Sequence, residues 1–494
     1  MSKVYLVGGG PGDPDLITIK GRRALEHADC VLYDHLAPAS LLSFAPANAE
    51  RLYVGKKKSE RAFTQEEICE MLIDRVRRGL NVVRLKGGDP YVFGRGGEEA
   101  EALAAAGIPF EVIPGITVPL GIAAYTGVPL THRGRSSAVT FVTGHDVTAA
   151  DWSRVGHSDT LVIFMGMMAW PEIARELIAH GRAPETPAMA VRWATRPDQE
   201  TITGTLATLP AMIETAHMKP PATIIVGEVV NLRPTLDWFE RLPLFGRRIA
   251  VTRAKEQAEP LTAQLRELGA EVSEIPSIEI VPAADYTALD QAISNLASYD
   301  WLIFTSANGV RHFAKRLDSS TTDLRALRAK ICAIGPATQA AVHALHLKVD
   351  VVAKEYVAES QLDALAKYEL AGKRVLLPRA AVAREVIPEE LAQRGAHVDV
   401  VEAYQTVVPA AMAGQIADLF HGPHKPHIVT FASSSAVRHF VTAASGAAAL
   451  DGVQVITIGP VTTDTAIGLG VKVSRQAREA TADGLLAAIL EGIE

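Results

Sequence analysis

The segment from Arg84 to Glu99 constrains the fold of this chain more than any other. The β-branched pair at 82–83 predicts a strand leading into it. Five glycines follow that strand, at positions 87, 88, 94, 96 and 97. A helix is expected from about Glu98 to Ala106, because Gly107 stands where such a helix ends. A strand that runs into a glycine-rich loop before a helix is where an open α/β sheet holds a small molecule.

The loop at the end of this strand has the chemistry of a binding site. Gly87 and Gly88 carry no Cβ, so a ligand can lie directly on their backbone. Asp89 adds a carboxylate at the same place, and Pro90 stiffens the exit from the loop. We therefore expect these residues to contact a ligand.

A second glycine-rich loop follows the first expected strand, within residues 4–18. Gly8 and Gly10 match the start of the dinucleotide-binding pattern, but Asp13 stands at the position of its third glycine. Pro11 also removes a backbone donor that a pyrophosphate would need. An acidic loop suits a cationic ligand or a ribose hydroxyl better than a phosphate. Nicotinamide binding and a tight turn without any ligand are the alternatives.

The bulk composition disfavours several classes of protein. A chain of 494 residues is too long for one core, so about two to four domains are expected. It has no run of 18 apolar residues and opens on a strand, which predicts neither a membrane span nor a signal peptide. The formal net charge of −7 argues against nucleic acid as the main partner. Cys30, Cys69 and Cys332 lie far apart, which fits a reducing cytoplasm and predicts neither a disulfide framework nor a metal site.

Strand-like and helical runs alternate along the whole chain, which predicts parallel α/β layers. The alternation breaks at 232–246, where two prolines and a closing glycine predict a linker. Beyond it the sequence repeats itself. Four segments recur in the same order: 246–253 with 372–379, 268–272 with 394–398, 304–313 with 431–440, and 334–338 with 458–462. This predicts two similar α/β lobes with a ligand cleft between them.

Ten short motifs follow one another through the first half. They are Val7–Asp13, Val31–His35, Val54–Lys56, Lys86–Pro90, Phe93–Glu98, Pro114–Thr117, Gly127–Arg133, Phe141–His145, Phe164–Gly166 and Pro221–Gly227. With them, residues 3 to about 239 resemble the uroporphyrinogen-III C-methyltransferases of the tetrapyrrole methylase family. The resemblance implies a tetrapyrrole methylase fold of two α/β subdomains, with S-adenosyl-L-methionine as the methyl donor.

This donor carries a sulfonium cation, which the carbonyls of the glycine loop and the Asp89 carboxylate can face. The resemblance places the donor against nine residues: Pro11, Gly87, Gly88, Asp89, Val92, Thr117, Val118, Met165 and Ala222. The pair Val118-Pro119 departs from the small residues that relatives usually carry there.

The resemblance also nominates the groups that handle protons during methyl transfer to pyrrole carbons, with Asp34 as acceptor and Lys56 as donor. As alternatives, Asp34 caps the next helix and Lys56 belongs to a solvated run at 56–58. The substrate carboxylates are expected at Arg95, His132 and Arg133, with the lysine run and Arg61 as further candidates. Arg95 is the strongest of these because it lies inside the glycine-rich loop.

The second half places hydroxyl and small residues at the start of several expected helices, a pattern that N-capping alone also explains. Its motifs lie at 304–306, 334–335, 404–406, 431–433 and 458–462. With these, residues 246–494 resemble uroporphyrinogen-III synthase, which closes linear hydroxymethylbilane into a ring and releases water. The resemblance assigns Tyr404 to assist departure of the hydroxyl, and a buried structural tyrosine is the alternative. It assigns the substrate carboxylates to Ser306, Thr338, Ser433 and Thr462.

Together the two resemblances predict a bifunctional α/β enzyme that makes precorrin-2 from hydroxymethylbilane, on the siroheme or cobalamin branch and without a metal. The expected domains are a methyltransferase at 1–240, a linker at 241–246 and a synthase at 247–494. The synthase lobes are expected at 247–282 with 408–494, and at 287–403. The methyltransferase resemblance also implies a homodimer. The alternatives are a methylase for another substrate, and a second half that binds tetrapyrroles without catalysis.

Overall fold

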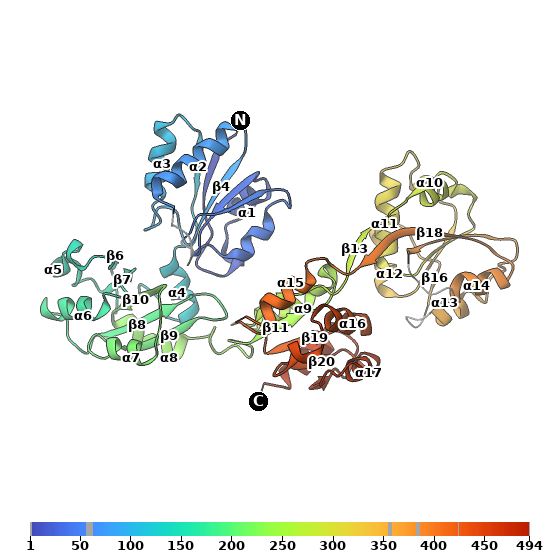
Figure 1. Cartoon of the computed structure of the whole chain (residues 1–494). Helices are drawn as coiled ribbons and strands as arrows, with labels where there is room; N and C mark the ends of the chain where they lie inside the picture. Colours follow the sequence, from blue (N-terminus) through green and yellow to red (C-terminus); the bar gives the residue numbers. More distant parts are fainter. Residues whose placement is uncertain (1, 56–62, 354–357, 382–385, 423, 494) are drawn as a thin grey trace. The chain divides into compact units, whose positions relative to one another are not determined.

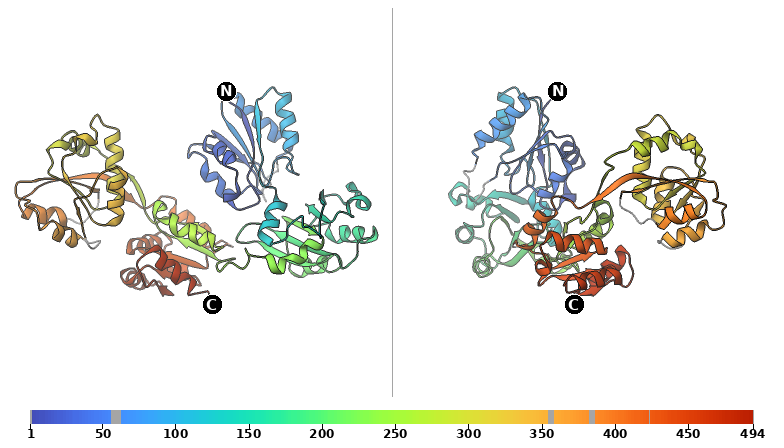
Figure 2. Two further views of the ribbon diagram at one scale, coloured as in Figure 1. Left: turned by 180° about the vertical axis from the view of Figure 1, so that it is seen from behind. Right: turned by 45° about the vertical axis from the view of Figure 1, so that its right-hand side comes forward.

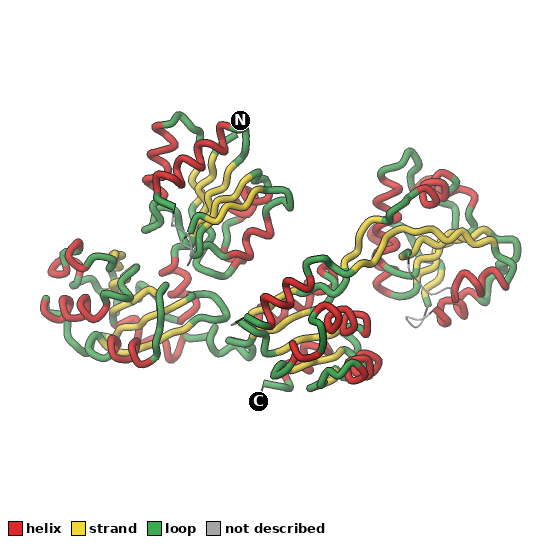
Figure 3. Tube along the Cα trace, in the orientation of Figure 1, coloured by secondary structure: helices red, strands yellow, loops and turns green. Residues whose placement is uncertain are grey.

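The computed structural model describes residues 2–55, 63–353, 358–381, 386–422 and 424–493. The chain forms two compact units, the first made mainly of residues 1–247 and the second mainly of residues 248–492. Each unit contains two β-sheets with helices packed against them (Figure 1, Figure 3). In the described part of the chain, no helix is long and apolar enough to cross a membrane.

The first sheet is fully parallel, with the strand order β3-β2-β4-β1-β5. Its strands are β1 (Val4–Gly8), β2 (Cys30–Tyr33), β3 (Glu50–Tyr53), β4 (Val82–Lys86) and β5 (Phe110–Ile113). Helices α2 (Gln65–Arg77) and α3 (Gly96–Ala105) cover one face and α1 (Ile19–Glu26) covers the other (Figure 1, Figure 2). Successive residues of β1 serve opposite cores, since Leu6 packs with the α2 side and Val7 with the α1 side.

The strand order places β1 between β4 and β5, so the loops that follow these three strands meet at one edge of the sheet. Open α/β sheets bind their ligands at such a point. The strand and the helix predicted around the glycine-rich loop are confirmed as β4 and α3. Helix α3 begins at Gly96, slightly before the expected start, because Arg95 takes the N-cap position.

The second sheet has the order β6-β7-β10-β8-β9 and is mixed, so the expectation of parallel layers throughout is wrong here. Its strands are β6 (Val139–Thr143), β7 (Thr160–Phe164), β8 (Pro187–Arg192), β9 (Glu200–Thr205) and β10 (Ala222–Val226). Strands β8 and β9 are joined by residues 193–199 without a helix, and so short a connection requires an antiparallel pair. Helices α5 (Trp152–Val155), α6 (Trp170–Ala179) and α7 (Leu209–Thr215) cover one face, and α4 (Val118–Thr126) packs on the other.

The segment at 232–246 is folded rather than extended. Helix α8 occupies Arg233–Leu236, and Phe239 is buried. The Tyr125 ring of α4 lies 5.3 Å from the Trp238 ring and 4.7 Å from the Phe239 ring, measured between centroids. Aromatic packing therefore holds the start of the predicted linker against the first unit.

In the second unit the sequence repeat appears as two sheets of matching strand order. One sheet has the order β12-β11-β19-β20-β21 and the other β13-β18-β17-β14-β15-β16. The repeat aligns β11 with β17, β14 with β19 and β15 with β20, so the two orders agree apart from β13. Each sheet therefore combines strands from both repeats. The strands are β11 (Arg248–Val251), β12 (Glu271–Glu274), β13 (Glu279–Pro282), β14 (Trp301–Phe304), β15 (Lys330–Ala333), β16 (Val351–Val352), β17 (Arg374–Ala380), β18 (His397–Val407), β19 (Ile428–Phe431), β20 (Gln454–Thr457) and β21 (Arg475–Gln476).

Strand β13 differs from the expected lobe boundaries. We expected 247–282 in the first lobe, but β13 pairs antiparallel with the end of β18 in the six-stranded sheet. Strand β18 continues to Val407, past residue 403, where the second lobe was expected to end. This extension supplies the edge to which β13 bonds. The helices of this unit are α9 (Lys255–Glu267), α10 (Thr287–Ser294), α11 (Ala307–Asp318), α12 (Pro336–Ala344), α13 (Ala358–Leu365), α14 (Val386–Gln393), α15 (Met412–Phe420), α16 (Ser434–Ala443), α17 (Pro460–Gly468) and α18 (Ala482–Leu490).

Candidate active site

Three loops lock together at the carboxyl ends of β1, β4 and β5. Gly9 donates its N–H to the Lys86 carbonyl at 2.7 Å, and Gly10 and Gly88 exchange backbone hydrogen bonds of 3.2 and 2.7 Å. Gly115 packs so closely that a Cβ on it would lie 2.3 Å from the Gly88 carbonyl oxygen. Backbone thus lies directly on backbone, and we call segments 8–10, 86–88 and residue 115 the glycine floor.

The two glycines of the β4 loop have different roles. A Cβ on Gly87 would lie 2.6 Å from the Leu36 carbonyl oxygen, so this glycine makes room for the loop after β2. Gly87 thus has a packing role of its own, and the ligand contact expected of its backbone stays a prediction. Gly88 has a φ of +65°, and the nearest atom to a Cβ there would be 3.6 Å away, on Val118.

Two carboxylates stand beside the glycine floor. Asp89 accepts hydrogen bonds from the N–H groups of Tyr91 and Gly115, at 2.8 and 3.0 Å. Asp13 accepts one from the Tyr125 hydroxyl at 2.6 Å, and burial together with this bond raises the pKa of that hydroxyl. Acidic groups fixed beside the glycine floor favour a cationic ligand over an anionic one.

The loop after β1 is braced by the connection between β8 and β9. The N–H of Asp13 donates to Thr195 Oγ1 at 2.8 Å, and the N–H of Thr195 donates to Gln199 Oε1 at 2.9 Å. Trp193 and Thr195 hold left-handed backbone, with φ of +50° and +66°. Non-glycine residues keep such strain only where their surroundings impose it, and they gather at functional sites.

A buried set of charges adjoins the loops after β2 and β4. Glu99 of α3 is fully buried, and its Oε1 accepts from Arg84 Nε at 3.1 Å, Lys86 Nζ at 2.9 Å and Gln65 Nε2 at 3.1 Å. Arg84 also donates to Asp34 Oδ2 at 2.9 Å. Burial is the main factor that lowers the pKa of Lys86, followed by repulsion from Arg84. We call Asp34, Arg84, Lys86 and Glu99 the ionic cluster.

Sequence reasoning missed three of these four residues. The sequence does contain a signal for them. Arg84 and Lys86 stand at alternate positions of β4, a strand whose other residues are all apolar. Charges in a central buried strand need partners, and their presence marks a polar site.

In the second unit, three side chains meet just after β14. Tyr404 of β18 is buried, and its hydroxyl lies 3.0 Å from Ser306 Oγ. Ser306 also caps α11 by accepting the Gly309 N–H at 2.9 Å. The His312 ring of α11 lies 5.4 Å from the Tyr404 ring, measured between centroids. Hydroxyl and imidazole groups are thus grouped around the predicted catalytic tyrosine.

Comparison with known proteins shows which family each half of the chain matches. Residues 3–210 match the tetrapyrrole (corrin/porphyrin) methylases, and residues 259–487 match uroporphyrinogen-III synthase HemD. A porphyrin biosynthesis protein HemD from Ruminiclostridium josui is 35% identical over 495 residues, which cover 99% of this chain and 97% of that protein. The chain belongs to the tetrapyrrole methylases fused to uroporphyrinogen-III synthase. It is a bifunctional protein of tetrapyrrole biosynthesis, with a methylase half and a synthase half.

Other relatives match one half. A siroheme synthase from Pseudomonas fluorescens (strain SBW25) is 50% identical over 242 residues, 48% of this chain and 52% of that protein. A crystal structure of uroporphyrin-III C-methyltransferase from Thermus thermophilus, complexed with S-adenyl homocysteine, is 42% identical and covers 47% of this chain and 100% of its own, with a TM-score of 0.41. A mutant uroporphyrinogen III synthase from the same extremely thermophilic species is 18% identical and covers 50% of this chain and 98% of its own, with a TM-score of 0.38.

Several predicted donor-binding residues of the methylase half adjoin the glycine floor. Gly88 faces Thr117, the N-cap residue of α4, and Val118, the first residue of that helix. Val92 and Val118 are partly buried against the same apolar cluster. Pro11 packs on α4, where a Cβ on Gly121 would lie 2.5 Å from its ring.

Two other predicted donor contacts come from the second sheet. Met165 follows β7 with a φ of +55° and is 53% exposed. Ala222 begins β10, and its side chain packs in the cluster on the α6 and α7 face. Val92 and Val118 pack against the cluster on the opposite face of the second sheet. Of Ala222, only the backbone can therefore reach the face on which those two residues lie.

The predicted basic residues lie at the surface of the methylase half. Arg95 is 59% exposed and pairs with Glu98 at 3.1 Å. His132 and Arg133 are exposed in a turn that a hydrogen bond from His132 to Ser136 closes. The other candidates, Lys56, Lys57, Lys58 and Arg61, lie outside the described residues.

The hydroxyl residues predicted for the synthase half divide into two kinds. Ser306 and Ser433 are the N-caps of α11 and α16 and accept backbone N–H groups at 2.9 and 3.1 Å, so the N-capping alternative holds for both. Thr338 and Thr462 are buried in the first turns of α12 and α17, with 3% and 5% exposure.

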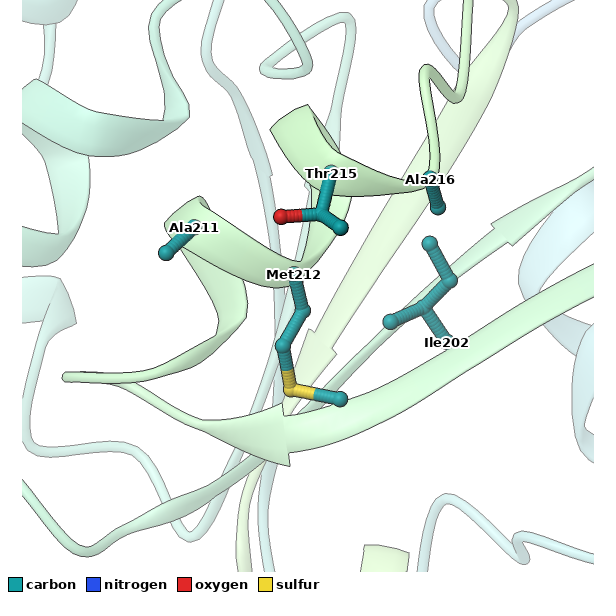
Figure 4. A pocket seen from close by; sticks show the side chains of 5 residues that line it. All are labelled: Ile202, Ala211, Met212, Thr215 and Ala216. Atoms are coloured by element: carbon teal, nitrogen blue, oxygen red, sulfur yellow. The ribbon is translucent and has the colours of Figure 1, made fainter.

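A shallow apolar hollow lies over β9 and α7 of the methylase half. It is lined by Ile202, Ala211, Met212, Thr215 and Ala216 (Figure 4). None of these residues ionises or belongs to the glycine floor or the ionic cluster, so this hollow is separate from the candidate site. Across the described ranges, no group of three or more His, Cys, Asp or Glu side chains could hold a metal ion.

Proposed function

We propose that the methylase half transfers two methyl groups from S-adenosyl-L-methionine to uroporphyrinogen III, giving precorrin-2. The observation that supports this most is the glycine floor with Asp13 and Asp89 beside it. A bare backbone lets a nucleoside lie close to the chain, and fixed carboxylates suit a sulfonium cation and ribose hydroxyls. The same acids disfavour the pyrophosphate of a nicotinamide dinucleotide.

In this reaction the chain supplies alignment and proton handling. The electron-rich pyrrole carbon is itself the nucleophile, so holding it against the methyl group supplies most of the rate enhancement. Asp34 is the proton acceptor in this proposal, and its side chain is 24% exposed while Arg84 fixes one of its oxygens. Lys56 is the proton donor, and Arg95, His132 and Arg133 hold the carboxylates of the tetrapyrrole.

For the synthase half we propose cyclisation of hydroxymethylbilane to uroporphyrinogen III with loss of water. Tyr404 assists the departing hydroxyl and has Ser306 and His312 beside it. Helices α12 and α17 follow Gly335 and Gly459, which have no side chain to cap them, and begin with Pro336 and Pro460. The N–H groups of the next residues, Ala337 and Val461, can receive substrate carboxylates. Ser306, Thr338, Ser433 and Thr462 are the proposed carboxylate contacts.

A second candidate is a synthase half that binds a tetrapyrrole without catalysis. The burial of Tyr404 favours this alternative, because a buried tyrosine with a bonded hydroxyl needs no catalytic role. Whether the second half catalyses cyclisation or only binds a tetrapyrrole, the proposed domains are the same. We assign residues 1–240 to the methyltransferase, 241–246 to a linker and 247–494 to the synthase. We also propose tetrapyrroles as the substrates and a homodimer through the methylase half.

A coupled assay tests the proposal. The full chain is incubated with hydroxymethylbilane and S-adenosyl-L-methionine, and the products are separated by isomer and mass. We expect a type III product with two added methyl groups and release of S-adenosylhomocysteine. A type I product would leave the synthase half as a binding module, and the absence of methyl addition to supplied uroporphyrinogen III would refute the methyltransferase assignment.

A further inference from the structure

The ionic cluster places three charged side chains in the interior of the methylase half. Arg84 and Lys86 are each 4% exposed and Glu99 is fully buried, although β4 lies inside the first sheet between β1 and β2. Replacing a buried ion pair by apolar side chains is often neutral or stabilising, so such a cluster is poor evidence of a purely structural role. In the described part of the chain, Glu99 Oε2 also has no hydrogen-bond partner, which adds a cost.

Asp34 is the one member of the ionic cluster that is open to solvent. This carboxylate is 24% exposed, whereas Arg84 and Glu99 are closed off from solvent. Both oxygens of Asp34 are fixed, one by Arg84 Nη2 at 2.9 Å and the other by the Leu36 N–H at 3.0 Å. The same guanidinium holds Glu99 through Nε at 3.1 Å, so one arginine links the exposed carboxylate to the buried one.

We propose that Arg84 and Glu99 are positioning residues that hold the Asp34 carboxylate in the orientation in which it accepts a proton. This inference rests on the proposed role of Asp34 in methyl transfer. Arg84 fixes one oxygen of Asp34 through Nη2, and Glu99 fixes the same guanidinium through Nε. Loss of either residue leaves the Asp34 carboxylate free to turn, and a misaligned base takes a proton more slowly.

Other ionisable groups around the cluster come from each neighbouring element. Lys86 of β4 bonds Glu99, Cys69 of α2 interacts with both, and Glu98 of α3 pairs with Arg95. His35 follows Asp34 and stacks against the Trp193 ring. Of the described residues, Arg84 alone bonds both Asp34 and Glu99, so it is the hydrogen-bonded link between these two carboxylates.

The test is the steady-state kinetics of uroporphyrinogen III methylation by the full chain, with each substrate varied in turn. Arg84→Gln and Glu99→Gln should each lower kcat by roughly tenfold or more and leave both KM values unchanged, because only the orientation of the base is lost. Glu101→Gln is the matched control, because Glu101 is an exposed carboxylate on the same helix, and its kcat should equal that of the wild type.

The split of kcat from KM distinguishes this role from a structural one. A residue needed only for folding would lower the unfolding temperature and the amount of active enzyme, while kcat per folded molecule stays unchanged. If either variant fails to fold, Arg84→Lys keeps the charge but cannot bridge two carboxylates, and it should lower kcat with both KM values unchanged. The inference is overturned if the folded variants keep the wild-type kcat, or if KM rises as much as kcat falls. If the wild type adds no methyl group, the proposed function itself fails.

Discussion

Five non-glycine residues in or beside the candidate site of the methylase half hold left-handed backbone. They are Phe93, Arg95, Met165, Trp193 and Thr195. Each such residue costs roughly 1–3 kcal/mol relative to an unstrained backbone, and the cost persists only where the surrounding structure imposes the conformation. At the scale of single residues, backbone strain thus marks the loops of the candidate site.

Arg95 combines this strain with an exposed charge, and replacing it should affect the tetrapyrrole more than the methyl donor. An ionic hydrogen bond to a carboxylate contributes about 1.5–3 kcal/mol, so Arg95→Ala should raise the KM for uroporphyrinogen III by roughly tenfold or more. The KM for S-adenosyl-L-methionine should change little. Steady-state kinetics with each substrate varied in turn measure both values.

Arg78→Ala is the control for this variant. Arg78 is 63% exposed and pairs with Asp74 on the same helix, much as Arg95 at 59% pairs with Glu98. Its loss should leave both KM values unchanged. Equal increases in the two KM values of Arg95→Ala would contradict a specific role in tetrapyrrole binding.

Gly115 should be intolerant of any side chain. The Cβ of Gly115→Ala would meet the Gly88 carbonyl oxygen at 2.3 Å and the Gly8 backbone at 2.7 Å, so the glycine floor must separate. We expect a loss of about 2 kcal/mol or more in the free energy of unfolding and weaker donor binding. Gly97→Ala is the matched control, because its Cβ meets no atom within 4 Å and alanine favours the α3 helix. Urea unfolding and calorimetric titration with S-adenosylhomocysteine would measure the two effects, and equal stability of both variants would argue against a rigid floor.

At the scale of elements, local sequence patterns predicted the strands and helices whose formation depends on residues adjacent in sequence. Strand β4 and helix α3 were predicted because β-branched residues and Gly107 act locally. The pairing of β13 with β18 and the antiparallel strands of the second sheet were not, because pairing depends on partners distant in sequence. For the same reason Glu99 was missed, since its partners on α2 and β4 are brought together only by the packing of α3 on the sheet. The packing role of Gly87 depends likewise on the position of Leu36 in another loop.

The contact between β3 and α2 should make stability depend on pH. Glu50 accepts two bonds from Arg75, at 2.9 and 3.0 Å, and these bonds are the main factor that lowers the pKa of Glu50. A lowered folded-state pKa stabilises the fold above the ordinary pKa of a glutamate, and this contribution is lost as the pH falls through the folded-state value. Glu50→Gln should therefore cost stability at pH 7 and lose its effect in acid.

The expected difference is no more than about 1 kcal/mol, because Glu50 is 41% exposed and solvent screens the pair. Urea unfolding followed by circular dichroism from pH 7 to about pH 3 would measure it against the wild type. Glu101→Gln removes an exposed carboxylate from α3 and should show no such trend. A constant difference across the whole range would show that the ion pair is not the cause.

At the scale of the whole molecule, the two repeats of the synthase half depend on each other. The sheet of β11 and β12 is completed by β19, β20 and β21 from the second repeat, and the sheet of β17 and β18 by β14, β15 and β16 from the first. Neither repeat contains a complete sheet, so each lobe needs both repeats. Sequence similarity reveals the repeat but not this exchange, because a strand's pattern does not say which sheet it joins.

The two halves of the chain, by contrast, each contain complete sheets and a separate proposed site. Asp34→Asn should therefore abolish methylation while hydroxymethylbilane cyclisation continues at the wild-type rate. Tyr404→Phe should slow cyclisation by roughly tenfold or more, while methylation of supplied uroporphyrinogen III stays at the wild-type rate. Both assays use the full chain, and combining the two variant proteins should restore dimethylated product from hydroxymethylbilane, because the type III intermediate can pass through solution. Failure of the mixture, with each variant retaining its own activity, would show that the intermediate must be handed over within one molecule.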